Sequence, residues 1–170
     1  MSQKIAVVGA GFIGRSWAMV FSKAGHHVSL YDIDPAALSE AMNLLEINLA
    51  DLESNGLISS KDDLLGRIQP YKTLEDAVEG AEWVQENALE NVQIKRKLFG
   101  LLDELLPETT ILASSTSAIS CSDISNGMKG AGRIIVAHPA NPPYLLPIVE
   151  LSGAPETKDE TIFRAKELLE

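Results

Sequence analysis

The chain has 170 residues, of which 45% are hydrophobic and 22% charged, a composition typical of a single globular domain without disordered tracts. Its formal net charge of -10 argues against nucleic acid or an anionic membrane as a main partner. Cys121 is the only cysteine, which excludes an internal disulfide and a Cys-x-x-Cys metal site, and we expect no bound metal ion.

The first third of the chain predicts a strand, a helix, a second strand and a second helix. Lys4 to Gly9 predicts a buried strand. The apolar start from Ile5 to Gly11 is too short to cross a membrane and is followed by amphipathic sequence instead of a cleavage site, so we expect a cytoplasmic protein. Phe12 to Ala24 predicts a helix that Gly25 ends. His27 to Asp32 predicts a strand, and Pro35 opens a helix through about Leu52.

The rest of the chain continues this alternation. We predict strands at 67–71, 83–86, 110–113, 134–137 and 146–151, and helices at 74–78, 90–106, 120–126 and 157–170. The charged stretch from Glu53 to Gly66 is assigned no element. In the helix at 90–106, helical spacing predicts a buried face made of Ile94, Leu98, Leu101, Leu102 and Leu105. Residues 1–170 therefore predict one α/β domain of the Rossmann type, with a doubly wound, mostly parallel sheet.

The turn after the first strand carries a dinucleotide fingerprint. It reads Gly9-Ala10-Gly11-Phe12-Ile13-Gly14, which fits G-x-G-x-x-G. Placed between a strand and a helix, the three glycines allow a tight turn, close approach to a pyrophosphate and close packing of helix on strand, while the helix start offers amide donors. The alternative is a glycine turn needed only for packing.

The residue at the end of the second strand indicates which dinucleotide binds. Asp32 stands where a carboxylate accepts both ribose hydroxyls of NAD and repels a 2′-phosphate. No Arg or Lys follows it, and Asp34 adds a further negative charge. The sequence therefore favours NAD over NADP.

A proline-rich segment near the end of the chain carries the candidate base. His138 follows the apolar run from Ile134 to Ala137, so it should lie at the carboxyl end of a strand, where open α/β sheets bind ligands. His138 and Asn141 each precede a proline, which favours extended backbone. Twelve residues on, Glu150 could return to orient the imidazole and favour its cationic form. The alternative is a surface histidine with an unrelated glutamate.

Other candidates for the reacting centre are weaker. A Tyr-x-x-x-Lys pair is missing, because no lysine stands four residues after any tyrosine. His26 and His27 lie in the turn after Gly25, far from the fingerprint, and we expect them at the surface. Ser117 follows another strand's carboxyl end, so it could offer a hydroxyl to the same substrate oxygen, although serine-rich turns are common.

Taken together, five segments resemble the 3-hydroxyacyl-CoA dehydrogenase superfamily, and in particular its N-terminal NAD-binding domain. They are Gly9 to Gly14, Asp32, Glu90-Asn91, Ser114 to Ser117, and His138 to Glu150. Within the superfamily they look most like the lambda-crystallin branch, which includes L-gulonate 3-dehydrogenase, with carnitine 3-dehydrogenase a close neighbour.

The resemblance implies roles for individual residues. It makes His138 the catalytic base, Glu150 its carboxylate partner, and Ser117 and Asn141 polar residues on the substrate side. Cofactor binding is implied for the following residues: Gly9, Gly11, Phe12, Ile13, Gly14, Asp32, Glu90, Lys95 and Ser117. Glu90 and Lys95 match positions near the nicotinamide half of NAD.

Two departures from the family bear on the substrate and on activity. The acyl-CoA enzymes carry a longer, lysine-rich insertion after the second helix, whereas residues 47–70 are short and mixed in charge. The family also continues into a helical domain that supplies a catalytic asparagine and forms a homodimer, and the sequence stops before it. The resemblance implies NAD-dependent oxidation of a small 3-hydroxy acid, with L-gulonate as the leading candidate substrate. The alternatives are carnitine, a 3-hydroxyacyl-CoA, or a non-catalytic dinucleotide-binding or crystallin-like structural module.

Overall fold

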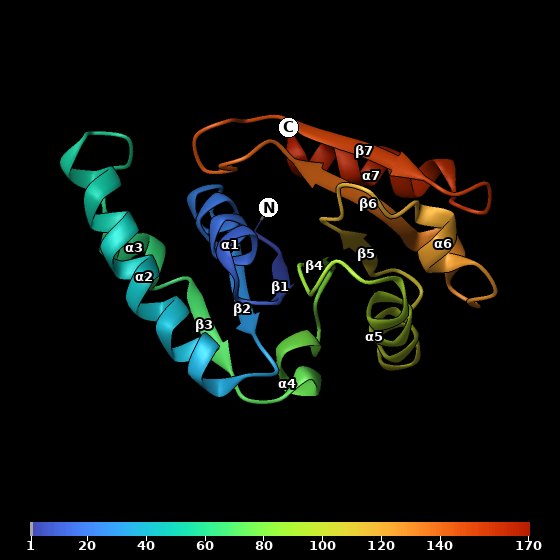
Figure 1. The fold of residues 1–170 in the computed structure, drawn as a ribbon. Coiled ribbons are helices and arrows are strands. Elements are labelled where there is room, and N and C mark those ends of the chain that lie inside the picture. The colour runs from blue at the N-terminus through green and yellow to red at the C-terminus, as the bar shows by residue number, and fades with distance from the viewer. Residues whose placement is uncertain (1) are drawn as a thin grey trace.

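In a computed structural model that describes residues 2–170, seven strands form one sheet with helices on both faces (Figure 1). The strands are β1 (Lys4–Val8), β2 (His27–Tyr31), β3 (Ile68–Tyr71), β4 (Trp83–Glu86), β5 (Ile111–Ser114), β6 (Ile134–Pro139) and β7 (Val149–Gly153). The helices are α1 (Phe12–Lys23), α2 (Pro35–Ser54), α3 (Lys61–Leu65), α4 (Leu74–Val78), α5 (Val92–Leu105), α6 (Cys121–Ser125) and α7 (Asp159–Leu169), with a 3-10 turn at Ala131–Arg133.

The strand order β3-β2-β1-β4-β5-β6-β7 confirms the predicted Rossmann-type sheet. All neighbouring pairs run parallel except β6 and β7, which run antiparallel. The order reverses between β1 and β4, and ligands of open α/β sheets bind in the crevice at such a switch point, beyond the carboxyl ends of the strands.

Alternate residues of each strand enter two separate cores. One core contains Val7, Trp17, Leu45 and Ala165, and so joins the sheet to α1, α2, α3 and α7. The other contains Val84, Phe99, Ile124 and Val136, and joins the opposite face to α4, α5 and α6. The double winding predicted from the strand and helix alternation is therefore confirmed.

Three local predictions were wrong. The charged stretch after α2 contains the short helix α3, whose cap Ser60 accepts a hydrogen bond from Asp63 N. The last strand starts at Val149 and not at Leu146, because Leu146 and Ile148 belong to an exposed loop. Burial on α5 follows Lys95, Phe99 and Leu102, whereas the predicted face residues Ile94, Leu101 and Leu105 are 42 to 45% exposed.

The predicted surface position of His26 was also wrong. The residue is buried, and its Nδ1 accepts a hydrogen bond from Gln3 N at 3.2 Å. His27 is exposed, as expected. Both residues lie at the start of β2, the amino edge of the sheet, which is opposite to the fingerprint. None of the helices in the described part of the chain combines the length and apolar character needed to cross a bilayer.

Candidate active site at the carboxyl edge of the sheet

The fingerprint turn joins β1 to α1 through backbone contacts that require glycine at two positions. Gly9 has a φ of +94°, and a Cβ there would lie 2.6 Å from the carbonyl oxygen of Asn87. A Cβ on Gly14 would overlap the carbonyl oxygen of Gly9. Both positions therefore support the tight turn and the close packing of α1 on β1 that the pattern predicts.

Gly11 differs from the other two glycines. It caps α1 with an ordinary φ of -62°, and a Cβ added there would meet nothing within 4 Å. No side chain of residues 2–170 caps the first turn of α1, whereas Asp34 and Asn91 cap α2 and α5. The backbone N–H groups of Phe12 and Ile13 at the start of α1 therefore have no side-chain acceptor, and such free donors at a helix N-terminus can bind a pyrophosphate.

Arg15 places a positive charge beside this turn. Its Nη1 donates to the carbonyl oxygen of Ala10 at 3.3 Å, and its buried Nε has no partner among the described residues. Arg15 was not among the predicted site residues, although its position directly after the third glycine of the fingerprint is a signal in the sequence.

Asp32 binds the fingerprint turn to the end of β2. Its Oδ2 accepts a hydrogen bond from Ala10 N at 2.7 Å, and its Oδ1 accepts one from Asp34 N at 2.9 Å. The carboxylate remains partly exposed, so it can still accept a hydrogen bond from a ligand hydroxyl. Asp32 therefore has a structural role in addition to the ribose contact that the sequence predicts.

The imidazole of His138 and the carboxylate of Glu150 meet at the end of β6. The two residues are direct cross-strand partners in the antiparallel β6–β7 ladder, and Nδ1 lies 3.0 Å from Oε2. A carboxylate only accepts hydrogen bonds, so in the neutral imidazole Nδ1 carries the proton and Nε2 keeps a lone pair. The imidazole is about one third exposed and Glu150 is 80% exposed, so the pair faces solvent or a ligand.

The other predicted substrate-side residues lie in neighbouring turns. Ser117 is exposed in the turn after β5, and its backbone N–H donates to Glu90 Oε1 at 3.2 Å. Asn141 is exposed two residues beyond β6. The structure therefore brings His138 and Glu150 into contact, and places Ser117 and Asn141 after strands that end at the same edge.

A buried ion pair lies beneath this edge, between β4 and α5. Lys95 Nζ contacts Glu86 Oε1 and Oε2 at 2.8 and 3.0 Å, and the two side chains are 1% and 0% exposed. Ser114 Oγ donates to Glu86 Oε2 at 2.6 Å, and Ala88 N donates to Oε1 at 2.7 Å. Lys95 is almost fully buried, and its Nζ also lies 3.4 Å from Oε2 of Glu90, whose side chain is 44% exposed.

Glu90 clamps the turn that carries Ser117. Its Oε1 accepts hydrogen bonds from Thr116 Oγ1 and from the backbone N–H groups of Ser117 and Ala118. Burial alone would raise the pKa of Glu90, but the hydrogen bond from Thr116 and the charge of Lys95 outweigh it, and the pKa is lowered. Glu90 is therefore ionised at neutral pH.

A second polar network ties α1 to the strand ends. Ser115 Oγ accepts hydrogen bonds from Trp17 Nε1 at 3.0 Å and from Gln85 Nε2 at 2.7 Å, and donates to Asn87 Oδ1 at 2.7 Å. Trp83 Nε1 donates to Gln85 Oε1 at 2.9 Å. These contacts fix the turns after β4 and β5 relative to the fingerprint helix.

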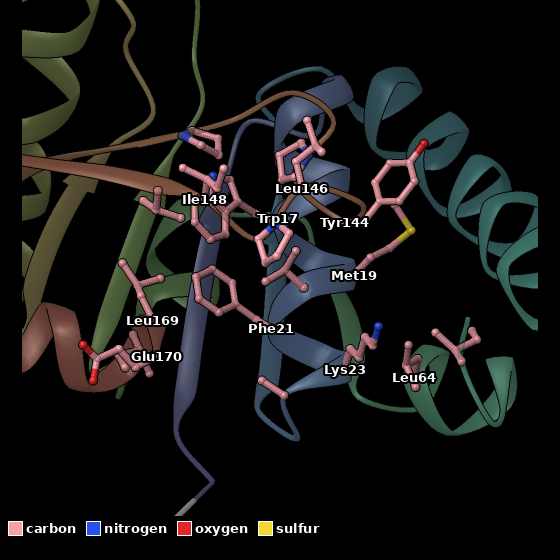
Figure 2. Close-up of a pocket in the computed structure, with 18 of the residues that line it drawn as sticks. Trp17, Met19, Phe21, Lys23, Leu64, Tyr144, Leu146, Ile148, Leu169 and Glu170 are labelled. Atoms are coloured by element: carbon pink, nitrogen blue, oxygen red, sulfur yellow. The ribbon is translucent and has the colours of Figure 1, made fainter. Parts of the chain in front are cut away.

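A large groove lies on the other face of the sheet. It encloses about 700 Å³ and is lined by α1, the loop after β6 and the end of α7, with Met19, Tyr144 and Leu146 among its walls (Figure 2). Pro139 and Val149 line it, and they point away from the face that carries His138 and Glu150, because side chains alternate along strands. The groove is therefore separate from the candidate base.

Sequence reasoning missed Gln85 and Glu86, the last two residues of β4, and also Ser115, which joins three hydrogen bonds. A signal for Glu86 was available: a glutamate that ends an apolar strand stands nine residues before a lysine on the following helix. No comparable signal identifies Ser115, because its partners come from α1 and from the end of β4, both distant from it in sequence.

Comparison with known proteins adds three kinds of finding. The sequence model of the 3-hydroxyacyl-CoA dehydrogenase NAD-binding domain matches residues 4–170. A lambda-crystallin homolog from Bos taurus is 42% identical over 168 residues, which are 97% of this chain and 52% of that protein. L-carnitine dehydrogenase of Streptomyces griseus is 38% identical over 155 residues, which are 91% of this chain and 46% of that protein.

Solved structures agree with these sequence relatives. A crystal structure of 3-hydroxybutyryl-CoA dehydrogenase from Escherichia coli K12 superposes with a TM-score of 0.94 at 31% identity, covering 99% of this chain and 36% of that one. A diketoreductase structure gives a TM-score of 0.93 at 26% identity and is covered over 61% of its chain. The chain spans about half the length of the curated relatives it matches.

Proposed function

The chain belongs to the 3-hydroxyacyl-CoA dehydrogenase family as an NAD-binding domain, and from this premise we propose that the protein oxidises the 3-hydroxyl group of a small hydroxy acid. NAD is the cofactor of the family and supplies the hydride acceptor. One observation carries the proposal: the 3.0 Å contact between His138 Nδ1 and Glu150 Oε2 at the carboxyl edge of the sheet. It leaves Nε2 of an oriented imidazole free to accept a proton.

In this mechanism His138 takes the proton of the substrate hydroxyl on Nε2. Glu150 holds the ring through Nδ1 and stabilises the imidazolium that forms, because an adjacent carboxylate favours the cationic imidazole. Ser117 and Asn141, both exposed at the same edge, position the substrate oxygen and its neighbours. Asp32 and the first-turn amides of α1 hold the adenosine ribose and the pyrophosphate.

The substrate we propose is L-gulonate, oxidised to 3-dehydro-L-gulonate. Support comes from the similarity to lambda-crystallin relatives and from the short segment after α2. The two basic residues of that segment are engaged within the protein: Lys61 pairs with Asp62 at 3.1 Å, and Arg67 Nη1 donates to Ser22 O at 3.4 Å. Few cations are left there for CoA phosphates, which favours a free acid over a thioester.

Three alternatives have specific support. Carnitine is suggested by relatives named L-carnitine dehydrogenase at 37 to 38% identity. A non-catalytic, crystallin-like role is suggested by the name lambda-crystallin among the relatives. A 3-hydroxyacyl-CoA substrate has the structural likeness to 3-hydroxybutyryl-CoA dehydrogenase in its favour.

A substrate panel separates these alternatives. The full-length protein is assayed with NAD and L-gulonate, L-carnitine, 3-hydroxybutyrate or 3-hydroxybutyryl-CoA, and kcat/KM is compared. We expect the highest value for L-gulonate. Activity confined to the CoA ester would remove the gulonate assignment, and NAD binding without turnover of any of the four would favour the non-catalytic role.

Replacing the proposed base tests the mechanism. His138→Asn should leave NAD affinity nearly unchanged and lower kcat by about 10²- to 10⁴-fold, the usual contribution of a general base. Stopped-flow turnover and calorimetric NAD titration measure the two quantities, and His27→Asn, at the opposite edge of the sheet, is the control. Near-normal turnover of the His138 variant would exclude His138 from proton transfer.

A further inference from the structure

The sheet topology indicates where the nicotinamide half of NAD lies. Asp32 ends β2 on one side of the switch point, and α1 begins at the switch point itself. With the adenosine ribose at Asp32 and the pyrophosphate at α1, the remaining half of the dinucleotide extends over the ends of β4 and β5. This placement rests on the proposed function, and it puts Glu90 and the turn of Ser117 beside the nicotinamide half.

Within the cluster of Glu86, Lys95 and Glu90, the charges sum to one negative charge. Buried Glu86 and Lys95 neutralise one another at 2.8 Å. Nζ of Lys95 is also shared with Ala88 O at 3.3 Å and with Glu90 Oε2 at 3.4 Å, so its donors are occupied within the protein. Glu90 carries the charge that is left over, and its side chain is 44% exposed.

Glu90 is fixed in place as well as charged. Thr116 Oγ1, Ser117 N and Ala118 N all donate to the same oxygen, Oε1, so the carboxylate cannot swing away from the turn. These hydrogen bonds favour the ionised carboxylate, in line with its lowered pKa. The site therefore presents a permanent, oriented negative charge.

We propose that Glu90 makes the site discriminate between the two redox states of its cofactor, favouring NAD⁺ over NADH. The nicotinamide ring is positively charged in NAD⁺ and neutral in NADH, while the rest of the dinucleotide is the same. A fixed carboxylate next to the ring attracts only the oxidised form. The discrimination favours the cofactor state that accepts hydride, because the charge strengthens binding of the oxidised form and leaves binding of the reduced form unchanged.

The test compares three ligands on the Glu90→Gln variant and on two control variants of the full-length protein. Kd is measured by calorimetry for NAD⁺, NADH and ADP-ribose, which lacks the nicotinamide ring. Glu90→Gln keeps an oxygen that accepts hydrogen bonds but removes the charge, so the ratio Kd(NAD⁺)/Kd(NADH) should rise by about three- to tenfold, the size expected for a partly exposed charge. Binding of ADP-ribose should change by less than about twofold.

Two controls separate the local charge from other effects. Glu108→Gln removes an exposed charge before β5, at the opposite edge of the sheet, and should leave the ratio unchanged. Thr116→Val loosens the clamp but keeps the charge of Glu90, so both affinities fall together and the ratio stays within about twofold.

An unchanged ratio in Glu90→Gln, or an equal rise in Glu108→Gln, would overturn the inference and leave the proposed dehydrogenase intact. If the unmodified protein bound none of the three ligands, the cofactor site itself would be wrong, and the proposed function would fail with it. The two failures are therefore distinguishable in one set of titrations.

Discussion

The carboxylate of Asp32 has two roles, one in holding the fingerprint turn and one in binding the cofactor. It accepts hydrogen bonds from Ala10 N and Asp34 N, and so closes the turn between β1 and α1 against the end of β2. The same group is where the adenosine ribose is expected. Binding of NAD and local order of the turn are consequently coupled at this residue, which sequence reasoning had assigned to the ribose alone.

Substitutions at Asp32 should expose this double role. Asp32→Ala leaves two backbone donors without their acceptor, so we expect NAD affinity to fall by about tenfold or more and the free energy of unfolding to fall by about 1 to 3 kcal/mol. Asp32→Asn keeps one acceptor oxygen and should recover part of the stability. Calorimetric titration and urea unfolding measure the two effects. A variant with full stability but no NAD affinity would mean that the ribose contact is its only role.

The fingerprint helix depends on two glycines in different ways. Gly14 lies against Gly9 and allows α1 to approach β1 closely. Its role is therefore in folding and not in ligand binding. Gly11 contacts nothing that a Cβ would disturb, so the folded protein does not require a glycine there. The space in front of it is needed only by a ligand.

This contrast gives a paired prediction. Gly14→Ala should lower the free energy of unfolding by about 1 to 3 kcal/mol, because a buried methyl group has to displace backbone. Gly11→Ala should leave stability within about 0.5 kcal/mol while NAD affinity falls by about tenfold or more. Thermal unfolding and NAD titration of both variants provide the readouts. Unchanged NAD affinity in Gly11→Ala would place the pyrophosphate elsewhere.

The two edges of the sheet have different physical characters. The carboxyl edge carries the fingerprint turn, the Glu90 clamp and the pair of His138 and Glu150. The amino edge buries His26 against Gln3 instead. Burial lowers the pKa of His26, so this edge contributes a pH dependence that belongs to folding and not to the chemistry.

The sign of that pH dependence follows from linkage. The folded protein holds His26 neutral to a lower pH than the unfolded chain does, so below about pH 6.5 the unfolded chain binds more protons and stability falls. Urea unfolding at pH 7.5 and 5.5 should therefore give a smaller free energy at the lower pH. His26→Asn, which keeps an acceptor for Gln3 N, should reduce the difference, and exposed His27→Asn should not. Equal pH differences in all three proteins would contradict the linkage to His26.

Periodicity and turn chemistry predicted most of the fold. The helix start at Phe12, the proline at the start of α2 and the apolar run of β6 are local signals, and each was placed within one or two residues. The five-residue α3 is too short for periodicity to detect. The predicted buried face of α5 is displaced by one residue from the observed one. Hydropathy assigns Lys95 to solvent, and only the ion pair with Glu86, nine residues earlier in the chain, makes the burial of Lys95 favourable.

The candidate site was predictable where its residues follow strands. Asp32, Ser117 and His138 were located from strand ends alone, since parallel strands bring those ends to one edge. The clamp of Glu90 was not predictable, because its donors lie 26 to 28 residues away in sequence. Contact between Glu150 and His138 also remained one of two alternatives until the antiparallel direction of β7 was known.

The antiparallel direction of β7 determines which sequence changes the site can tolerate during evolution. His138 and Glu150 face one another because the β6–β7 ladder sets them opposite, whatever the course of the residues between them. Insertions or replacements within residues 140–148 can reshape the loop between β6 and β7 without separating the proton acceptor from its carboxylate. A shift of β7 by one residue, in contrast, would turn Glu150 to the opposite face. The fold thereby keeps the acid–base pair constant while a loop remains free to adapt to new substrates.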